Sequence, residues 1–309
     1  MKKIKEQMPL KGHKQAQIFE IGLNSTPKGK VLRFVREIFK DFNKNTNRYP
    51  RVFIVTPNPE IILMTQIDQN LSEILNSADF AVPDGVGLSQ AAKFLELPNP
   101  KNKLFRFFSL IFQGLVVGLS TFVNKKWLYK PLNTIKGREL FMDLVRLANK
   151  KSWRIYLLGG RDGVAEKTAE VLLKNLKKVK IKYSSGPELT NSANPIDKSN
   201  IKVEKDIIDQ INEFRPHFLF VAFGPGKQEK WLYKWLPKLN IGAGMVVGGT
   251  FDYVSGKTKL PPSWMANSGL EWVWRLITQP FYYPKRIKRV FTAFPVFPLK
   301  VFWYKFNLK

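Results

Sequence analysis

Residues 51–87, RVFIVTPNPEIILMTQIDQNLSEILNSADFAVPDGVG, predict one β-α-β unit and decide the fold class. The β-branched and aromatic run at 51–55 is typical of a short buried strand, and residues 80–82 predict a second one. Between them, apolar residues at helical spacing predict a helix over 60–77. Each strand ends in a polar turn, and ligands of open α/β sheets bind beyond the carboxyl ends of the strands. The two turns are therefore candidate site segments.

Strands and helices keep alternating outside this unit. Before it, the pattern predicts a strand at 18–23 and a helix at 31–42, and after it a short helix at 89–95. Further strands are expected at 153–158, 179–183, 217–223 and 244–247, with helices at 137–150, 164–176, 203–214 and 227–235 and a polar loop at 184–200. This alternation predicts an α/β fold with a doubly wound, mainly parallel sheet.

The composition limits the chemistry. The 309 residues carry a formal net charge of +27, which calls for a polyanionic partner such as nucleic acid, anionic lipid or a phosphorylated substrate. The chain has no cysteine, which excludes disulfides and cysteine-based metal sites. The only histidines are His13 and His217, so we expect a carboxylate as any general base. The basic N-terminus lacks the apolar core of a secretory signal, which favours a cytoplasmic protein.

An apolar segment interrupts the α/β pattern near 99–131. Residues 107–123 carry no charge, no acidic residue occurs between Glu96 and Glu139, and lysines lie on both sides. The run is short of the roughly 20 apolar residues of a bilayer span and is diluted by polar residues. Three interpretations stay open: a membrane span, a helix in the membrane surface, and a core helix or lid.

The C-terminal region has a different composition. Residues 272–309 contain no acidic residue and alternate basic with aromatic side chains. This pattern suits an anionic membrane interface and also single-stranded nucleic acid. The apolar segment favours the membrane. The predicted organisation is a basic tail at 1–17, a core at 18–250 and a membrane-associating C-terminal appendage at 251–309.

Several strand ends carry residues suited to a phosphorylated ligand. Glycine pairs or triplets follow three predicted strands, and glycine lets the backbone approach a phosphate. No GxGxxG or GxxxxGK[ST] pattern is present, which argues against dinucleotide oxidoreductases and P-loop ATPases. Asp84 is the preferred candidate for chemistry, although Asp before Gly is also a common turn pair. Thr56 and Asn58 suit helix caps as well as ligands, and Lys227 suits an anion.

Linked motifs then indicate a family. TPNPE, ADFAVPDGVG, KGRELFMDL, WRIYLLGG, FGPGKQEKW, VGGTFDYVSGKTKLPPSWM and GLEWVWRL occur in this order. The chain resembles the WecG/TagA/CpsF family of bacterial glycosyltransferases from about Ile18 to about Tyr283, with an insert at about 99–131. Family members often have an arginine just before the segment matching Lys136, where this chain has Thr134.

The resemblance implies a fold and a reaction. The fold would be a Rossmann-like core with a C-terminal appendage that reaches the membrane. The reaction would transfer an N-acetylhexosamine, typically N-acetylmannosamine or its uronic acid, from UDP to an undecaprenyl-diphosphate-linked sugar, with inversion and without a DxD metal motif or other cofactor. The product would enter teichoic acid or other cell-surface polysaccharide, with the enzyme peripheral on the inner face of the plasma membrane. Homo-oligomers stay open, and no nucleic acid is expected.

The resemblance also implies roles for particular residues. Asp84 would be the general base. The substrate-binding residues would be Thr56, Asn58, Gly85, Gly159, Gly160, Lys227, Gln228, Gly249, Asp252, Arg275, Lys285 and Arg286. Among these, Gln228 and Asp252 would contact the nucleotide-sugar, and the three last residues would reach the diphosphate.

This mechanism agrees with elementary chemistry. A sugar hydroxyl is a poor nucleophile, so a carboxylate must take its proton as the new bond forms. The departing diphosphate gains charge that arginines and backbone N–H groups stabilise. Two alternatives remain: an inactive family member that serves as a scaffold, and a basic nucleic-acid-binding protein.

Overall fold

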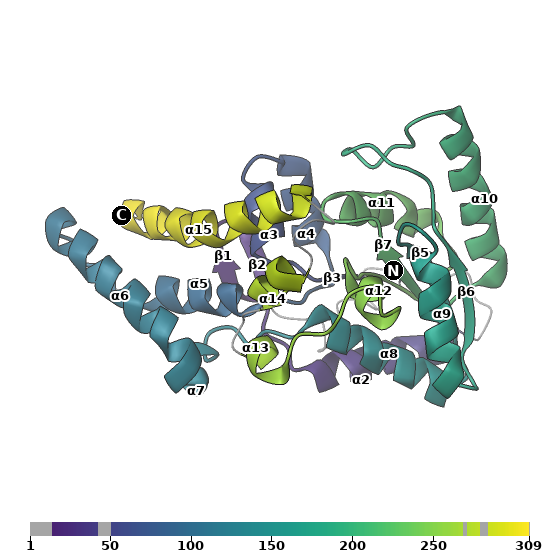
Figure 1. Ribbon diagram of the computed structural model, residues 1–309, viewed down its shortest axis with the longest axis horizontal. Coiled ribbons are helices and arrows are strands. Elements are labelled where there is room, and N and C mark those ends of the chain that lie inside the picture. Colours follow the sequence, from purple (N-terminus) through teal and green to yellow (C-terminus); the bar gives the residue numbers. More distant parts are fainter. Residues whose placement is uncertain (1–13, 43–50, 268–270, 279–283, 309) are drawn as a thin grey trace.

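The computed structural model contains a six-stranded, all-parallel sheet between two layers of helices (Figure 1). It describes residues 14–42, 51–267, 271–278 and 284–308. The strand order is β4-β3-β8-β7-β5-β6, with β3 at Val52–Val55, β4 at Phe80–Ala81, β5 at Arg154–Gly159, β6 at Lys180–Ser184, β7 at Phe218–Ala222 and β8 at Ala243–Val246. The expected α/β class and parallel sheet are confirmed.

Two apolar clusters, one on each face, hold the helices to the sheet. One cluster joins the sheet to α2 (Lys28–Phe42), α8 (Gly137–Lys150), α9 (Val164–Asn175) and α12 (Thr250–Val254). The other joins it to α3 (Pro59–Thr65), α4 (Gln69–Ser77), α5 (Val86–Glu96), α10 (Lys198–Phe214) and α11 (Lys227–Trp235). In the inner strands alternate residues enter opposite clusters, as in Ile155 and Tyr156 of β5, while the edge strand β6 contributes only partly buried Ile181. The sheet is therefore covered on both faces, as in a doubly wound fold.

The prediction of one continuous helix over 60–77 is wrong. It divides into α3 and α4 at residues 66–68. The Asp68 side chain accepts the Leu71 N–H at 3.0 Å and begins α4 as its N-cap. Ile67 kept the apolar spacing in the sequence, yet it is 88% exposed at the junction. Local capping therefore outweighed the periodic pattern.

The strand expected at 18–23 is an antiparallel hairpin. β1 (Lys14–Ile18) pairs with β2 (Ile21–Asn24), and Phe19 turns the chain with a positive φ of 53°. The predicted basic tail at 1–17 overlaps β1, while residues 1–13 lie outside the described part. Further along, α5 begins at Val86, three residues before the predicted start, because Gly85 ends the preceding turn.

The apolar segment and the C-terminal region form helices that lie together. The segment contains α6 (Lys103–Val123) and α7 (Lys125–Leu128). The C-terminal helices are α13 (Ser263–Asn267), α14 (Glu271–Thr278) and α15 (Pro284–Asn307), and η1 (Leu236–Lys238) precedes β8. α15 contacts α3, α5 and α6, and Figure 1 shows α6 and α15 extending from the same end of the molecule, away from α10. The end of α15 thus packs onto the core through buried Phe297 and Val301.

Candidate functional site

The two polar turns of the central β-α-β unit lie in contact beyond β3 and β4. The Asp84 N–H donates to the Pro57 carbonyl at 2.8 Å. The Pro59 ring packs against Gly87, where an added Cβ would lie 3.0 Å from Pro59 Cγ. Gly85 has a φ of +95°, which lets the chain leave the turn and enter α5. The sequence therefore correctly placed both turns at one edge of the sheet.

Thr56 and Asn58 hold the first turn in place. Buried Thr56 Oγ1 donates to the Val246 carbonyl at 3.2 Å, which ties β3 to β8 where both strands end. Asn58 Oδ1 accepts the Ile61 N–H at 2.9 Å and caps α3. The capping alternative for Asn58 is thus confirmed, and its contact with a substrate stays a prediction.

The start of α8 closes over Asp84. A Cβ added at Gly137 would lie 3.2 Å from Asp84 Oδ2 and 3.6 Å from Thr56 Cβ. Glycine is thus the residue that lets the helix approach this carboxylate. The positive end of the α8 dipole suits a negative side chain at this place. Asp84, Thr56 and Gly137 form what we call the carboxylate cluster.

Arg138, which the sequence reasoning missed, adds a cation beside this cluster. Its guanidinium donates two hydrogen bonds of 2.8 Å to Glu271 at the start of α14. It lies over the Tyr253 ring, 5.3 Å from the centroid. Burial alone would lower the pKa of Arg138, but the Glu271 carboxylate, with Tyr253 and Asp84 further off, raises it. Arg138 therefore links α8, α12 and α14 around Asp84. The only signal in the sequence was its place in the KGREL motif.

A buried polar pair joins β7 to β8. Gln228 Oε1 accepts the Gly248 N–H at 3.2 Å, and Gln228 Nε2 donates to Glu229 Oε1 at 2.9 Å. Glu229 Oε2 accepts the Gly226 N–H at 2.7 Å. Burial raises the pKa of fully buried Glu229 to about 7. Gln228 thus shapes the glycine turn after β8, whereas its contact with a nucleotide-sugar stays a prediction.

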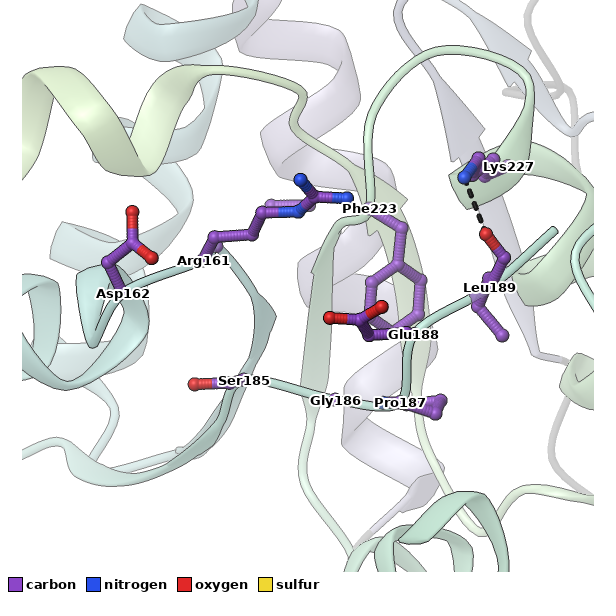
Figure 2. Close-up of a pocket in the computed structure, with 11 residues that line it drawn as sticks. Arg161, Asp162, Ser185, Gly186, Pro187, Glu188, Leu189, Phe223 and Lys227 are labelled. Carbon is purple, nitrogen blue, oxygen red and sulfur yellow. Dashed lines mark hydrogen bonds between the residues drawn. The ribbon is translucent and has the colours of Figure 1, made fainter. Parts of the chain in front are cut away.

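A pocket of about 260 Å³ lies beyond β5, β6 and β7 (Figure 2). It is lined by Gly160, Arg161, Asp162, Ser185, Gly186, Pro187, Glu188, Leu189, Ala222, Phe223 and Lys227. Figure 2 shows Arg161 extended toward Phe223, with Ser185 and Glu188 opposite. The Lys227 ammonium donates to the Leu189 carbonyl at 2.5 Å and so holds the loop after β6 against α11. Gly160 and Lys227 were predicted site residues, while Arg161 was not.

The other predicted residues lie in different surroundings. Gly159 abuts β7, since an added Cβ would be 2.6 Å from the Ala222 carbonyl oxygen. Gly249 is the N-cap of α12, and Asp252 lies in the first turn of that helix. Arg275 belongs to α14 and Lys285 and Arg286 to α15, but the side chains of these three lie outside the described residues.

His217, the histidine in the described part of the chain, takes no part in the clusters described above. Buried His217 precedes β7, at the amino end of the strand, and stacks on Trp153 at 5.3 Å. Burial lowers its pKa to about 3, with Arg154 adding to the effect. Within the described ranges, no group of three histidine or acidic side chains is arranged to hold a metal ion.

Comparison with known sequences identifies the class of enzyme. Residues 17–112 and 115–309 match the sequence model described as the Glycosyl transferase WecG/TagA/CpsF family. The match extends over nearly the whole chain, so the protein is a glycosyltransferase by descent. It belongs to the WecG/TagA/CpsF family, as its motifs indicated. The match also runs through the apolar segment apart from residues 113–114, so this segment is not wholly outside the family pattern.

Named relatives are moderately similar to this chain in sequence. The N-acetylglucosaminyldiphosphoundecaprenol N-acetyl-beta-D-mannosaminyltransferase of Bacillus spizizenii is 28% identical over 230 residues, 74% of this chain and 72% of the relative. The protein of the same name from Bacillus subtilis is 28% identical over 235 residues, 76% and 74% of the two chains. That from Staphylococcus aureus is 25% identical over 281 residues, 90% of each chain.

Proposed function

We propose that the chain transfers an N-acetylhexosamine, N-acetylmannosamine or its uronic acid, from a UDP-sugar to an undecaprenyl-diphosphate-linked sugar. The names of the relatives support the mannosaminyl donor group and the lipid-linked acceptor. The product would serve teichoic acid or related cell-wall polysaccharide synthesis. Transfer would invert the anomeric centre, because a single base-assisted displacement by the acceptor hydroxyl reverses the configuration.

The observation that carries the proposal is the surroundings of Asp84. This carboxylate lies beyond β4, in van der Waals reach of Gly137, with the Arg138 charge close by. In the proposed step Asp84 takes the proton from the acceptor hydroxyl while that oxygen bonds to the anomeric carbon. The bond from this carbon to the UDP oxygen breaks, and UDP leaves with the electron pair.

The donor would extend from the carboxylate cluster toward the pocket of Figure 2. The glycine turns after β7 and β8 lie along the edge between them, and glycine lets the backbone approach a diphosphate closely. Arg161 and Lys227 bring positive charge to the pocket, which the carboxylates of Asp162 and Glu188 also line. Gly85, Gly160, Gly249 and Asp252 remain proposed donor contacts, and Arg275, Lys285 and Arg286 remain proposed diphosphate ligands.

A lipid-linked acceptor places the enzyme at a membrane. We propose a peripheral location on the inner face of the plasma membrane, because the UDP-sugar donor is a cytoplasmic metabolite. The basic and aromatic composition of residues 272–309 supports attraction to anionic lipid. The C-terminal region is accordingly proposed as a membrane-associating appendage.

The test is UDP release from a panel of UDP-N-acetylhexosamines. A short-chain lipid-diphosphate-GlcNAc serves as the acceptor, and wild type is compared with Asp84→Asn. We expect acceptor-dependent release by wild type and a loss of about 100-fold or more in kcat for the variant, since general-base catalysis supplies about 10²–10⁴-fold. Asp79→Asn is a poor control, because the Asp79 carboxylate accepts the Phe53 N–H in the core. Asp162 is exposed but lines the pocket, so its substitution is also unsuitable. Asp206→Asn, on the exposed side of α10, is the matched control.

Each outcome has a definite meaning. Full activity of Asp84→Asn would remove this carboxylate from the mechanism. UDP binding without release from any donor would support the scaffold alternative. A chain that binds RNA with strong salt dependence, and binds no UDP, would refute the transferase and support the nucleic-acid alternative.

A further inference from the structure

Helix α6 has its apolar side turned outward. The side chains along its outer face are Leu104, Phe108, Phe112, Leu115, Leu119 and Phe122, and each is at least 61% exposed. They recur every three or four residues, so they form one continuous stripe about 27 Å long. A helix on the surface of a water-soluble protein normally shows the opposite arrangement. An exposed apolar stripe of this length marks an interaction surface.

Beyond its first residue, Lys103, the polar side chains of α6 point inward. Arg106, Ser120 and Thr121 are all buried, and Gln90 Nε2 donates to Thr121 Oγ1 at 2.8 Å. Gln113 Nε2 donates to the Pro98 carbonyl at 2.9 Å. The inner face is therefore bound to the rest of the chain through hydrogen bonds.

Two buried cations clamp α6 to the end of α15. The Arg106 guanidinium donates to the carbonyls of Phe306 and Leu308 at 2.8 and 2.9 Å, where the last carbonyls of α15 need partners. The Lys305 ammonium donates to Gln113 Oε1 at 2.8 Å, and burial lowers the pKa of Lys305 to about 8. α6 and α15 thus act as one unit, and Trp303 of α15 adds a half-exposed aromatic ring to it.

Positive charge lies at both ends of the stripe. Lys101 and Lys103 precede it, Lys125 and Lys126 follow it, and all four are exposed. No acidic residue occurs from residue 97 to residue 138. An anionic bilayer complements both features, because it offers an apolar layer beneath a layer of negative headgroups.

We propose that the outer face of α6 is a membrane-docking surface that lies flat in the headgroup region of an anionic bilayer. This proposal deepens the membrane association in the proposed function, but it does not depend on the sugar chemistry. The anchor would then be α6 together with the end of α15, rather than the basic C-terminal region alone.

The contacts of α6 argue against two other arrangements. A bilayer span would bring Arg106, Gln113 and Thr121 into lipid and break their hydrogen bonds to the protein. Pairing of two copies through α6 would bring lysine-bearing ends together, whether the helices ran parallel or antiparallel. The segment itself has no acidic residue to compensate those charges.

Vesicle binding by the full chain tests the surface. The probe is vesicles of phosphatidylcholine with phosphatidylglycerol in equal parts, and co-sedimentation measures the partition coefficient. We expect Phe112→Ser/Leu119→Ser to lower it about tenfold or more, because two apolar side chains lose their lipid contact. The matched control is Leu173→Ser/Ile201→Ser, on exposed positions of α9 and α10. Lys103→Gln/Lys126→Gln should weaken binding by about fivefold per lysine, unlike Lys174→Gln/Lys178→Gln.

A cysteine scan fixes the orientation independently of stability. The chain has no native cysteine, so a single introduced one carries an environment-sensitive fluorophore. Labels at positions 104, 115 and 122, which share the outer face of α6, should show equal depth by quenching from lipid-attached groups, and a label at position 201 should stay in water. A label at 115 much deeper than those at 104 and 122 would indicate a span and overturn the proposal.

Two further results would also overturn it. The first is equal vesicle binding by Phe112→Ser/Leu119→Ser and its control. The second is a lipid-free dimer that this variant dissociates, since a second copy would then cover the stripe. Loss of sugar transfer with retained vesicle binding would count against the proposed function alone.

Discussion

Gly137→Ala tests whether the approach of α8 to Asp84 matters for catalysis. The added Cβ would lie 3.2 Å from Asp84 Oδ2 and 3.6 Å from two carbons of Thr56. The first distance is shorter than an ordinary van der Waals contact, so the carboxylate must shift by a few tenths of an ångström. A displacement of about 1 Å in an active site costs about 100-fold in rate. We therefore expect kcat to fall about three- to tenfold.

The same substitution should leave the fold intact. Alanine favours a helix over glycine by up to about 1 kcal/mol, which offsets part of the local crowding. Unfolding in urea should therefore give a free energy within about 1 kcal/mol of wild type. Affinity for UDP, measured by calorimetry, should stay unchanged because Asp84 acts on the acceptor. The effect thus belongs to kcat.

Gly29→Ala is the matched control. Gly29 also lies in the first turn of a helix, α2, and an added Cβ there meets no atom within 4 Å. UDP release with saturating donor and acceptor provides kcat for both variants. Equal kcat for Gly137→Ala and Gly29→Ala, in folded protein, would refute the reasoning that places Asp84 at the reacting centre.

Three further predictions concern the surroundings of the site. Arg138→Gln and Glu271→Gln should show a coupling free energy of about 1–2 kcal/mol in a double-mutant unfolding cycle. The reason is that each side chain is only partly exposed and the pair is bidentate. Additive effects of the two substitutions on the free energy of unfolding would contradict a stabilising ion pair. Burial raises the folded-state pKa of Glu229 from 4.5 to about 7. Between these two pH values the folded chain binds more protons than the unfolded chain, so the free energy of unfolding should fall by up to about 3 kcal/mol as pH rises from 4.5 to 7. Urea unfolding at pH 5 and pH 7 should show this loss in wild type and not in Glu229→Gln. Gly159→Ala should destabilise the folded chain by about 2 kcal/mol more than Gly224→Ala. Both glycines have a positive φ, but only an alanine at 159 would place its Cβ 2.6 Å from a backbone oxygen. Equal melting temperatures of the two variants would show that β7 moves aside.

The sequence predicted the α/β layers because short buried strands and their turns leave local signals. Proline and glycine end β3 and β4 where predicted, and the contact between their turns follows from parallel pairing. The division of α3 from α4 was not predicted. Ile67 continues the apolar spacing, and only the structure shows that Asp68 caps a new helix there.

Long-range pairs set the limit for the site. Arg138 was not predicted as a site residue, because its partner Glu271 is 133 residues away and no local pattern connects them. Glu229 lies in the first turn of α11, an ordinary place for a glutamate, so the sequence carries no local signal of its burial. Its burial depends on the loop after β7, which places Gly226 N–H against the carboxylate. The turn after β4 that holds Asp84 and Gly85 was predicted, since its signals lie within one short motif, and the roles of both residues stay predictions.

The apolar segment shows what hydrophobicity alone leaves open. A charge-free run is compatible with a span, a surface helix and a core helix. The choice depends on where the polar side chains point, and in α6 they face the protein. That information comes from tertiary packing against α5 and α15.

The docking surface and the carboxylate cluster are connected by α5. This helix begins at Val86, two residues after Asp84, and its 11 residues rise about 16 Å before the chain turns into α6. A bilayer on the outer face of α6 would thus hold the proposed base at a set distance from the headgroups, where the diphosphate of a lipid-linked acceptor lies. Phe112→Ser/Leu119→Ser should therefore raise KM for an acceptor embedded in vesicles about as much as it weakens vesicle binding. With a water-soluble short-chain acceptor, KM and kcat should match those of Leu173→Ser/Ile201→Ser. A fall in activity of equal size with both acceptors would show that the substitutions in α6 act on the site through the fold. Membrane docking would then not be the cause of the lost activity.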